Sequence, residues 1–173
     1  MNGRLNPNPG GAPPSQLSPI QPLRLPTNLA EWCGTQKLVE WIQEEVQKLE
    51  WQQHWAQLDR KFPDYRPKVA VAVLAYACAT WVFGSEEIVR ACHADPNLQR
   101  FCEGKIPFDE ELDHFRRVNR TLLEDLLTAV FVRAVAEKSN VDLEAFPPVM
   151  KQYLHSRAVE RVDIVRHVDT WDE

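Results

Sequence analysis

Apolar residues in this chain recur mainly at steps of three and four, which is the spacing of one face of a helix. No stretch alternates between apolar and polar residues for long enough to indicate a strand. The region 31–62 shows the helical pattern, with Leu38, Trp41, Ile42 and Val46 on one stripe. We therefore predict an all-α fold, a compact multi-helix bundle with this region as an amphipathic helix.

The region 69–83 is different, because it carries no charge and, as a helix, would be apolar around nearly its whole circumference. Pro67 suits the first turn of such a helix, and Gly84 is expected to end it. The uncharged stretch extends over seventeen residues from Val69 to Ser85, which is at the lower limit for a membrane span. Its high alanine content favours a buried helix in the middle of the bundle instead.

Capping signals predict where other helices begin. The side chains expected to cap helices are those of Thr35, Ser85, Asp95 and Asp109. Pro96 fits the first position after its cap, and Thr-Leu-Leu-Glu at 121–124 fits a capping box. The residues expected to face inward are Ile88, Val89, Cys92, Leu112, Phe115, Leu123, Leu126, Leu127, Val130, Phe131 and Ala134.

The region 149–168 is predicted to be a further amphipathic helix. Its apolar side consists of Met150, Tyr153, Leu154, Ala158, Val162 and Val165. Arg161 is expected to lie away from that side. The pattern leaves open whether this helix docks on the bundle or pairs with a second copy of the chain.

Residues 1–26 hold seven of the thirteen prolines, with Gly, Asn and Ser between them. Such a segment buries too little apolar surface to offset its ordering entropy, so we expect a disordered tail. The predicted organisation is then this tail, a helical domain over 27–140, and a linker with the C-terminal helix over 141–173.

Chain length, net charge and cysteine spacing limit which functions are plausible. A chain of 173 residues has room for one domain with a core, and its net charge of −5 is unlike that of a dedicated DNA-binding module. The four cysteines form no CxxC pair, so we expect reduced, mostly buried thiols and no zinc site.

Catalytic signatures are missing as well. The five histidines have no metal-binding spacing, and neither a phosphate loop nor a nucleophile elbow occurs. We therefore expect no enzyme activity, no cofactor and no small-molecule substrate. The first residues lack a charged segment followed by an apolar one, so we expect a cytoplasmic protein that is not bound to a membrane.

The order of features from Tyr65 to Lys138 resembles the N-terminal helical domain of DDE-type transposases of bacterial insertion sequences. The matching text is Gly84-Ser85, Arg90-Ala91-Cys92, Cys102-Glu103-Gly104 and Phe115-Arg116-Arg117. No one of these motifs is specific, but their order is that of the family. The resemblance implies a helix-turn-helix-like segment over 85–119 and a role in DNA recombination, as a DNA-binding or accessory protein.

The likeness stops after Val-Asp-Leu-Glu at 141–144. There the family continues with Asp-Gly-Thr, which brings its first metal-binding carboxylate, whereas this chain has Phe-Pro-Pro-Val-Met-Lys at 146–151. A two-metal site needs carboxylates that a sheet brings together, and the remaining residues leave no room for one. We therefore expect the chain to be catalytically inactive.

Under the DNA-binding interpretation, Arg116, Arg117 and Arg120 are the main candidates for phosphate contacts, and Arg100 and Lys105 are nearby in sequence. We expect the three arginines at 116, 117 and 120 to be exposed. Against this, the same helix starts with the carboxylates of 109–111, which suit its positive end but would face phosphates.

Three functions remain open. The first is weak binding of double-stranded DNA, or an accessory role with a full-length transposase. The second is a helical protein–protein interaction module, including self-association, that has lost the DNA surface. The third is a truncated transposase without function. Pairing of the arginines with Glu110, Glu111 or Asp113 would favour the last two.

Overall fold

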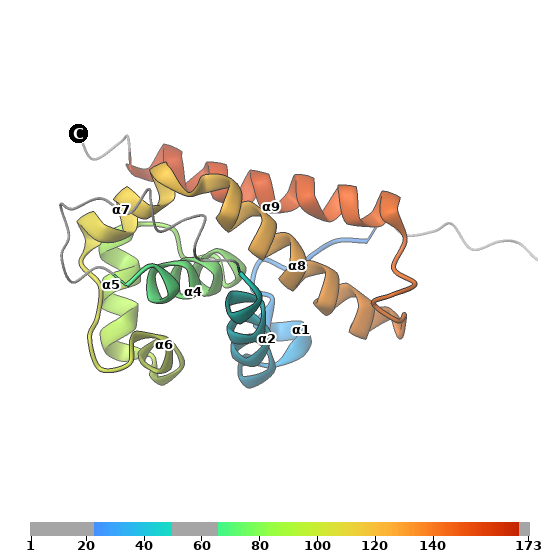
Figure 1. Ribbon diagram of the computed structural model, residues 1–173, viewed down its shortest axis with the longest axis horizontal. Helices are drawn as coiled ribbons and strands as arrows, with labels where there is room; N and C mark the ends of the chain where they lie inside the picture. The colour runs from blue at the N-terminus through green and yellow to red at the C-terminus, as the bar shows by residue number, and fades with distance from the viewer. Residues whose placement is uncertain (1–22, 50–65, 170–173) are drawn as a thin grey trace, which may run out of the picture.

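The computed structural model describes residues 23–49 and 66–169, with side chains described through residue 164. Throughout these ranges the regular structure is helical, which confirms the all-α prediction. The helices are labelled in Figure 1. They are α1 (Ala30–Cys33), α2 (Thr35–Lys48), α4 (Pro67–Ala79), α5 (Ser85–Ala94), α6 (Pro96–Cys102), α7 (Asp109–Val118), α8 (Arg120–Ser139) and α9 (Pro148–Asp169).

Helix α4 is the centre of the bundle. Every residue from Val69 to Ala79 is buried, and α4 contacts α2, α5, α6, α7 and α8. Full burial stabilises the folded state by about 1.5–3 kcal/mol for each large aliphatic side chain. A helix with neighbours on all sides therefore needs apolar residues around its whole circumference. The prediction of a buried central helix from Pro67 is confirmed. Among the described residues, no helix is both long enough and apolar enough to cross a membrane.

Helix α4 ends at Ala79, earlier than Gly84 led us to expect. The hydroxyl of Thr80 donates to the Tyr76 carbonyl at 2.8 Å, and the Val82 N–H donates to the Ala77 carbonyl at 2.9 Å. Trp81 between them has a φ of 68°, a left-handed conformation that ends a helix. The chain therefore turns away one helical turn before the glycine.

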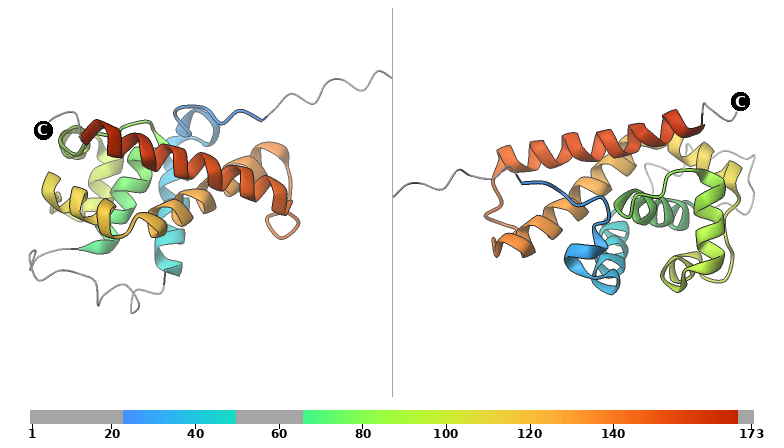
Figure 2. Two further views of the ribbon diagram at one scale, coloured as in Figure 1. Left: turned by 90° about the horizontal axis from the view of Figure 1, so that it is seen from above. Right: turned by 180° about the vertical axis from the view of Figure 1, so that it is seen from behind.

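Helices α8 and α9 form a long hairpin, and they lie side by side in each view of Figures 1 and 2. Leu154, Ala158 and Val162 of α9 are buried against the bundle. The question that the sequence left open is thus answered in part, since α9 docks on its own chain.

The segment before α1 is also part of the fold. Leu23 and Leu25 pack against the core, and the Tyr153 hydroxyl donates to the Leu23 carbonyl at 3.0 Å. The ordered fold therefore begins before residue 26, where the tail was predicted to end, because Leu23 and Leu25 bury apolar surface against the core. Residues 1–22 of the predicted tail lie outside the described residues.

Several helix starts differ from prediction by one or two residues. The caps are Gly34, Gly84, Phe108 and Asn119 rather than Thr35, Ser85, Asp109 and Thr121. At α7 the first turn is held by the Glu111 carboxylate, which accepts from the Phe108 N–H at 3.0 Å. Asp95 is the cap that the sequence predicts correctly, and its side chain accepts from the Asn97 N–H at 2.8 Å.

The region predicted as one helix over 31–62 begins as two helices. Gly34 has a φ of 80° and separates α1 from α2. Leu38, Ile42 and Val46 of the predicted stripe are buried, as expected. The part of the prediction after residue 49 lies outside the described residues.

Arg161 is the largest departure from the expected pattern. The sequence predicts it away from the apolar side of α9, but it is 5% exposed. Its guanidinium donates to the carbonyls of Cys78 and Ala79, each at 3.1 Å, and to the carbonyl of Pro26. The last carbonyls of a helix have no partner within it, so Arg161 satisfies the buried end of α4.

Aromatic rings enclose the same guanidinium. Its central carbon lies 4.8 Å from the ring centre of Phe131 and 5.2 Å from that of Trp81, both favourable cation–π distances. Burial lowers the pKa of Arg161 to about 10, so the side chain is still charged at neutral pH.

We expect Leu74→Ala to lower the free energy of unfolding by about 2–5 kcal/mol, because Leu74 is fully buried on α4 and its truncation leaves a cavity. Urea unfolding followed by circular dichroism measures this loss. Val118→Ala is the control, since Val118 is 42% exposed at the end of α7 and should change stability by less than about 0.5 kcal/mol. Equal effects for the two variants would contradict a central α4.

We expect Arg161→Met to destabilise the fold by about 3 kcal/mol, although methionine keeps much of the side-chain volume. The physical reason is that the Cys78 and Ala79 carbonyls lose their donor while they remain buried. Arg157→Met on the same helix is the control, since Arg157 is partly exposed and pairs with the exposed Glu160. A stability loss no larger than that of the control would show that Arg161 is not needed as a cap.

Candidate functional site

Arg116, the first of the predicted DNA contacts, lies inside the protein. It is 7% exposed, so the expectation that this position is exposed was wrong. Its guanidinium donates to the Phe83 carbonyl at 2.8 Å and to the Ser85 hydroxyl, and it forms an ion pair with Asp113. Arg116 therefore attaches α7 to the turn between α4 and α5.

Ser85 and Asp113 explain why this network forms. The Ser85 hydroxyl hydrogen bonds to Asp113 and Arg116 instead of capping α5. Asp113 and Arg116 are three residues apart on α7, a spacing that brings side chains together on one face. The sequence shows that an arginine and several acids share this helix, but whether Asp113 and Arg116 are buried depends on where α7 packs.

Arg120 has its charge paired twice. Its Nε lies 2.6 Å from a Glu124 oxygen on α8, and its Nη2 lies 2.6 Å from an Asp163 oxygen on α9. The hydrogen bond to Glu124 and the charge of Asp163 raise the pKa of Arg120 above its usual value. This arginine joins the two helices of the hairpin.

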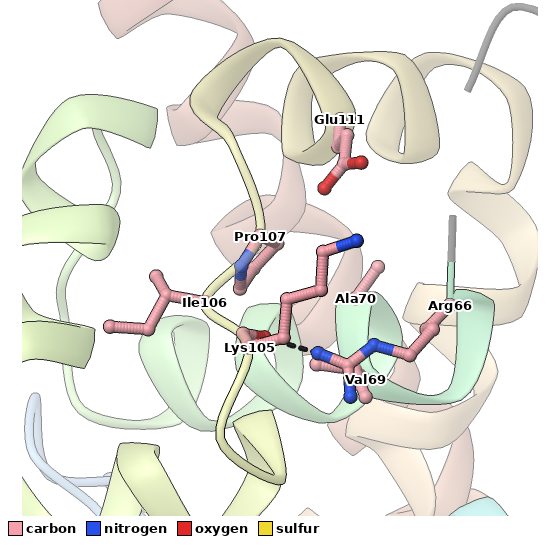
Figure 3. Close-up of a pocket in the computed structure, with 7 residues that line it drawn as sticks. All are labelled: Arg66, Val69, Ala70, Lys105, Ile106, Pro107 and Glu111. Carbon is pink, nitrogen blue, oxygen red and sulfur yellow. Dashed lines mark hydrogen bonds between the residues drawn. The ribbon is translucent and has the colours of Figure 1, made fainter. Parts of the chain in front are cut away.

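The three remaining candidates, Arg100, Lys105 and Arg117, are exposed on different elements: α6, the loop before α7, and the end of α7. Lys105 borders a hollow of about 10 Å³ with Arg66 and Glu111, shown in Figure 3. That volume is about the size of one water probe, so the hollow has no space for a larger ligand. The prediction that these residues bind DNA stays a prediction, as does the helix-turn-helix character of 85–119.

The cysteines are consistent with their expected structural role. Cys78, Cys92 and Cys102 are buried, Cys33 is partly exposed, and all four are free thiols. The hydrogen bond between Cys92 and Cys102, with burial, raises the pKa of Cys92, so it stays a thiol at neutral pH. Among the described residues, no three His, Cys, Asp or Glu side chains come close enough to hold a metal ion.

A second hollow on the described surface is a groove that the sequence did not indicate, and it is much larger than the hollow beside Lys105. It has a volume of about 690 Å³, and its exposed lining is mostly apolar. It lies between α2, α8, α9 and the loop that joins the hairpin. We call it the hairpin groove, and it is lined by Glu45, Lys48, Asp125, Thr128, Ala129, Val132, Arg133, Leu143, Pro148, Lys151, Gln152 and His155.

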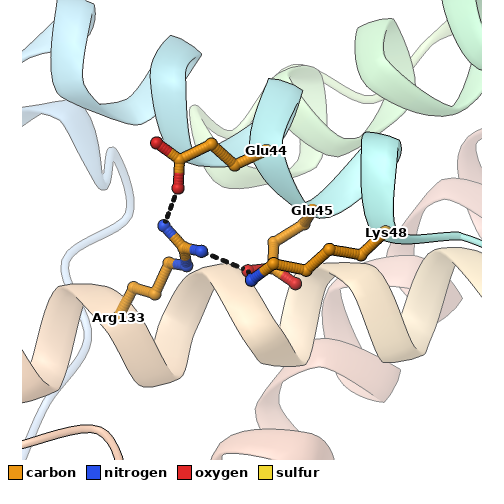
Figure 4. A network of polar contacts seen from close by, with 4 residues as sticks. All are labelled: Glu44, Glu45, Lys48 and Arg133. Carbon is orange, nitrogen blue, oxygen red and sulfur yellow. Dashed lines mark hydrogen bonds and ion pairs between the residues drawn. The ribbon is translucent and has the colours of Figure 1, made fainter.

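Ion pairs build the α2 wall of the hairpin groove. Arg133 of α8 lies 2.6 Å from Glu44 and 2.7 Å from Glu45, and Glu45 also lies 2.8 Å from Lys48 (Figure 4). Arg133 and Glu45 are each 14% exposed, so their pairing is largely shielded from solvent. Two acids and two bases thus neutralise one another, and this wall offers no net charge.

The floor of the hairpin groove is held by a short hydrogen-bonded chain. The Thr128 hydroxyl donates to the Glu124 carbonyl at 2.7 Å, and His155 Nδ1 lies 3.1 Å from the same hydroxyl. Since the hydroxyl has one proton, it accepts from His155, whose Nδ1 then carries a hydrogen. This bond fixes the distance between α8 and α9 in the middle of the groove.

Only tertiary packing makes this groove. Its residues come from helices distant in sequence, and no motif connects them. Leu143 is 49% exposed in its lining, but nothing in the sequence marks it as part of a groove.

Comparisons with protein-family models, with curated proteins and with solved structures found no match to this chain.

We expect Arg116→Ala to destabilise the protein by about 3 kcal/mol, since it leaves Asp113 and the Phe83 carbonyl without their buried donor. Arg117→Ala, the matched control at the next position, is exposed and should change stability by less than about 0.5 kcal/mol. Thermal unfolding of both variants gives the comparison. If Arg116→Ala melts like the wild type, the buried network has no structural role.

Proposed function

We propose that this chain is a helical protein–protein interaction module and that the hairpin groove is its binding surface. The observation that carries the proposal is that candidate DNA-binding charges are paired within the chain, whereas apolar surface is left exposed in the groove. Arg116 and Arg120, two of the three main candidates for DNA contact, pair with acids of the same chain. The groove, in contrast, leaves apolar surface exposed.

DNA binding is supported less well. Affinity for DNA comes largely from cations that neutralise phosphates, and the net charge of −5 opposes it. The exposed candidates Arg100, Lys105 and Arg117 are on separate elements, and Glu110 is exposed on the same helix as Arg117. The resemblance to transposase domains is compatible with the proposal, because an accessory role with a transposase also acts through a protein partner.

Contact with protein can be tested in cells that express the chain. A photo-crosslinking amino acid at Ala129, within the hairpin groove, is expected to trap a protein. The same amino acid at exposed Gln99 on α6 is the control and should trap little. A crosslinked protein at both positions or at neither would overturn the assignment of the groove.

We expect no binding of duplex DNA even at low salt, as measured by fluorescence anisotropy. Three phosphate contacts from Arg100, Lys105 and Arg117 would instead give a slope of log affinity against log salt of about −2.7, since each contact contributes about −0.9. Binding with such a slope, flattened by about 0.9 in Arg117→Ala, would restore the DNA-binding function.

A further inference from the structure

The charges that line the hairpin groove are not equivalent. Lys48 of α2 and Arg133 of α8 are neutralised by their ion pairs with glutamates of α2. Asp125 on α8 and Lys151 on α9 are exposed, and neither forms an ion pair with a described residue. After internal pairing, the groove therefore keeps one acid and one base on opposite helices.

One acid and one base on the same surface have a specific consequence for binding. A strongly acidic or basic partner would meet a like charge at one of the two positions, which is unfavourable. A two-fold axis between the two residues, in contrast, puts each Asp125 opposite the Lys151 of another copy. Two-fold interfaces require such self-complementarity.

Apolar groups at the end of the groove complete this surface. Leu143, which lines the groove, is 49% exposed in the loop of the hairpin. Ala129 and Val132 supply the partly buried apolar floor. The surface thus has a hollow with an apolar floor and an exposed leucine in its lining, both of which can be covered in a symmetric contact.

We propose that the hairpin groove is a homodimer interface, in which Asp125 of each copy pairs with Lys151 of the other. This inference rests on the proposed function and names the partner as a second copy of the chain. Apolar contact at the groove supplies the affinity, and the two ion pairs select the orientation. Paired exposed charges contribute little energy, so their main effect is on which partner is accepted.

The test is a charge exchange in the full chain, followed by sedimentation equilibrium over a concentration series. Wild-type protein is expected to dimerise. In Asp125→Lys both groove positions are basic, and in Lys151→Asp both are acidic, so each variant alone repels its own copy. Because the two-fold axis makes every contact occur twice, we expect each to weaken the dimer about 10-fold or more.

Recombining the charges is the decisive step. An equimolar mixture of Asp125→Lys and Lys151→Asp restores opposite charges at both contacts, so it should form a heterodimer near wild-type affinity. The double variant Asp125→Lys/Lys151→Asp should recover the homodimer. Glu110→Lys and Arg90→Asp are matched controls, since both residues are exposed outside the groove and should leave the dimer unchanged.

The outcomes separate the inference from the proposed function. The homodimer interface is overturned if the wild type is monomeric at all concentrations, or if the charge exchange leaves the dimer dissociation constant unchanged. If a groove crosslink to a different protein is found in that case, the interaction module stands with another partner. Far-UV circular dichroism and thermal unfolding of every variant exclude loss of the fold as the cause of lost association.

Discussion

The buried C-terminal end of α4 is the constraint on which the rest of the structure depends. A central helix that is apolar on all sides must bury its last carbonyls, and buried carbonyls without donors are unfavourable. Arg161 of α9 donates to the carbonyls of Cys78 and Ala79, and the Leu29 N–H also donates to Ala79, at 2.8 Å. The turn that follows is held by Arg116 of α7 through the Phe83 carbonyl. Segments from both ends of the described chain thus meet at this one point.

This use of arginine also determines what the surface can bind. Arg116, Arg120 and Arg133 act as connectors between elements, with acids of the same chain as partners. A charge that is satisfied internally is not available to a phosphate without loss of the contact that it already makes. Three arginines of the described residues are therefore committed to the fold, whereas the hairpin groove leaves apolar surface exposed. That balance is the physical basis for favouring a protein over a nucleic acid as the ligand.

Helix type and core residues were accessible from sequence because they depend on local periodicity. The uncharged region around Leu74 had to be central, and Leu123, Leu127 and Phe131 are buried as their spacing predicts. Helix starts were predicted less accurately, since a polar side chain near a helix terminus can hydrogen bond to other side chains instead of capping the helix. Ser85 illustrates this, because its hydroxyl serves the network of Asp113 and Arg116 instead. The candidate site was not predictable, since its walls belong to helices that no sequence motif relates.

The sequence by itself determined an all-helical chain, the buried position of α4 and the amphipathic nature of α9, because side-chain periodicity alone encodes which face is apolar. Only the tertiary structure decided which charged residues are buried. Arg161 was expected away from the apolar side of α9, yet it lies seven residues after Leu154 and so on the same face of the helix. It is buried there because its guanidinium meets the carbonyls at the end of α4. Arg116 and Arg117 are neighbours in sequence, but one is buried and the other exposed. The physical reason is that a charge is buried only where particular donors and acceptors meet, and packing between distant segments sets that meeting.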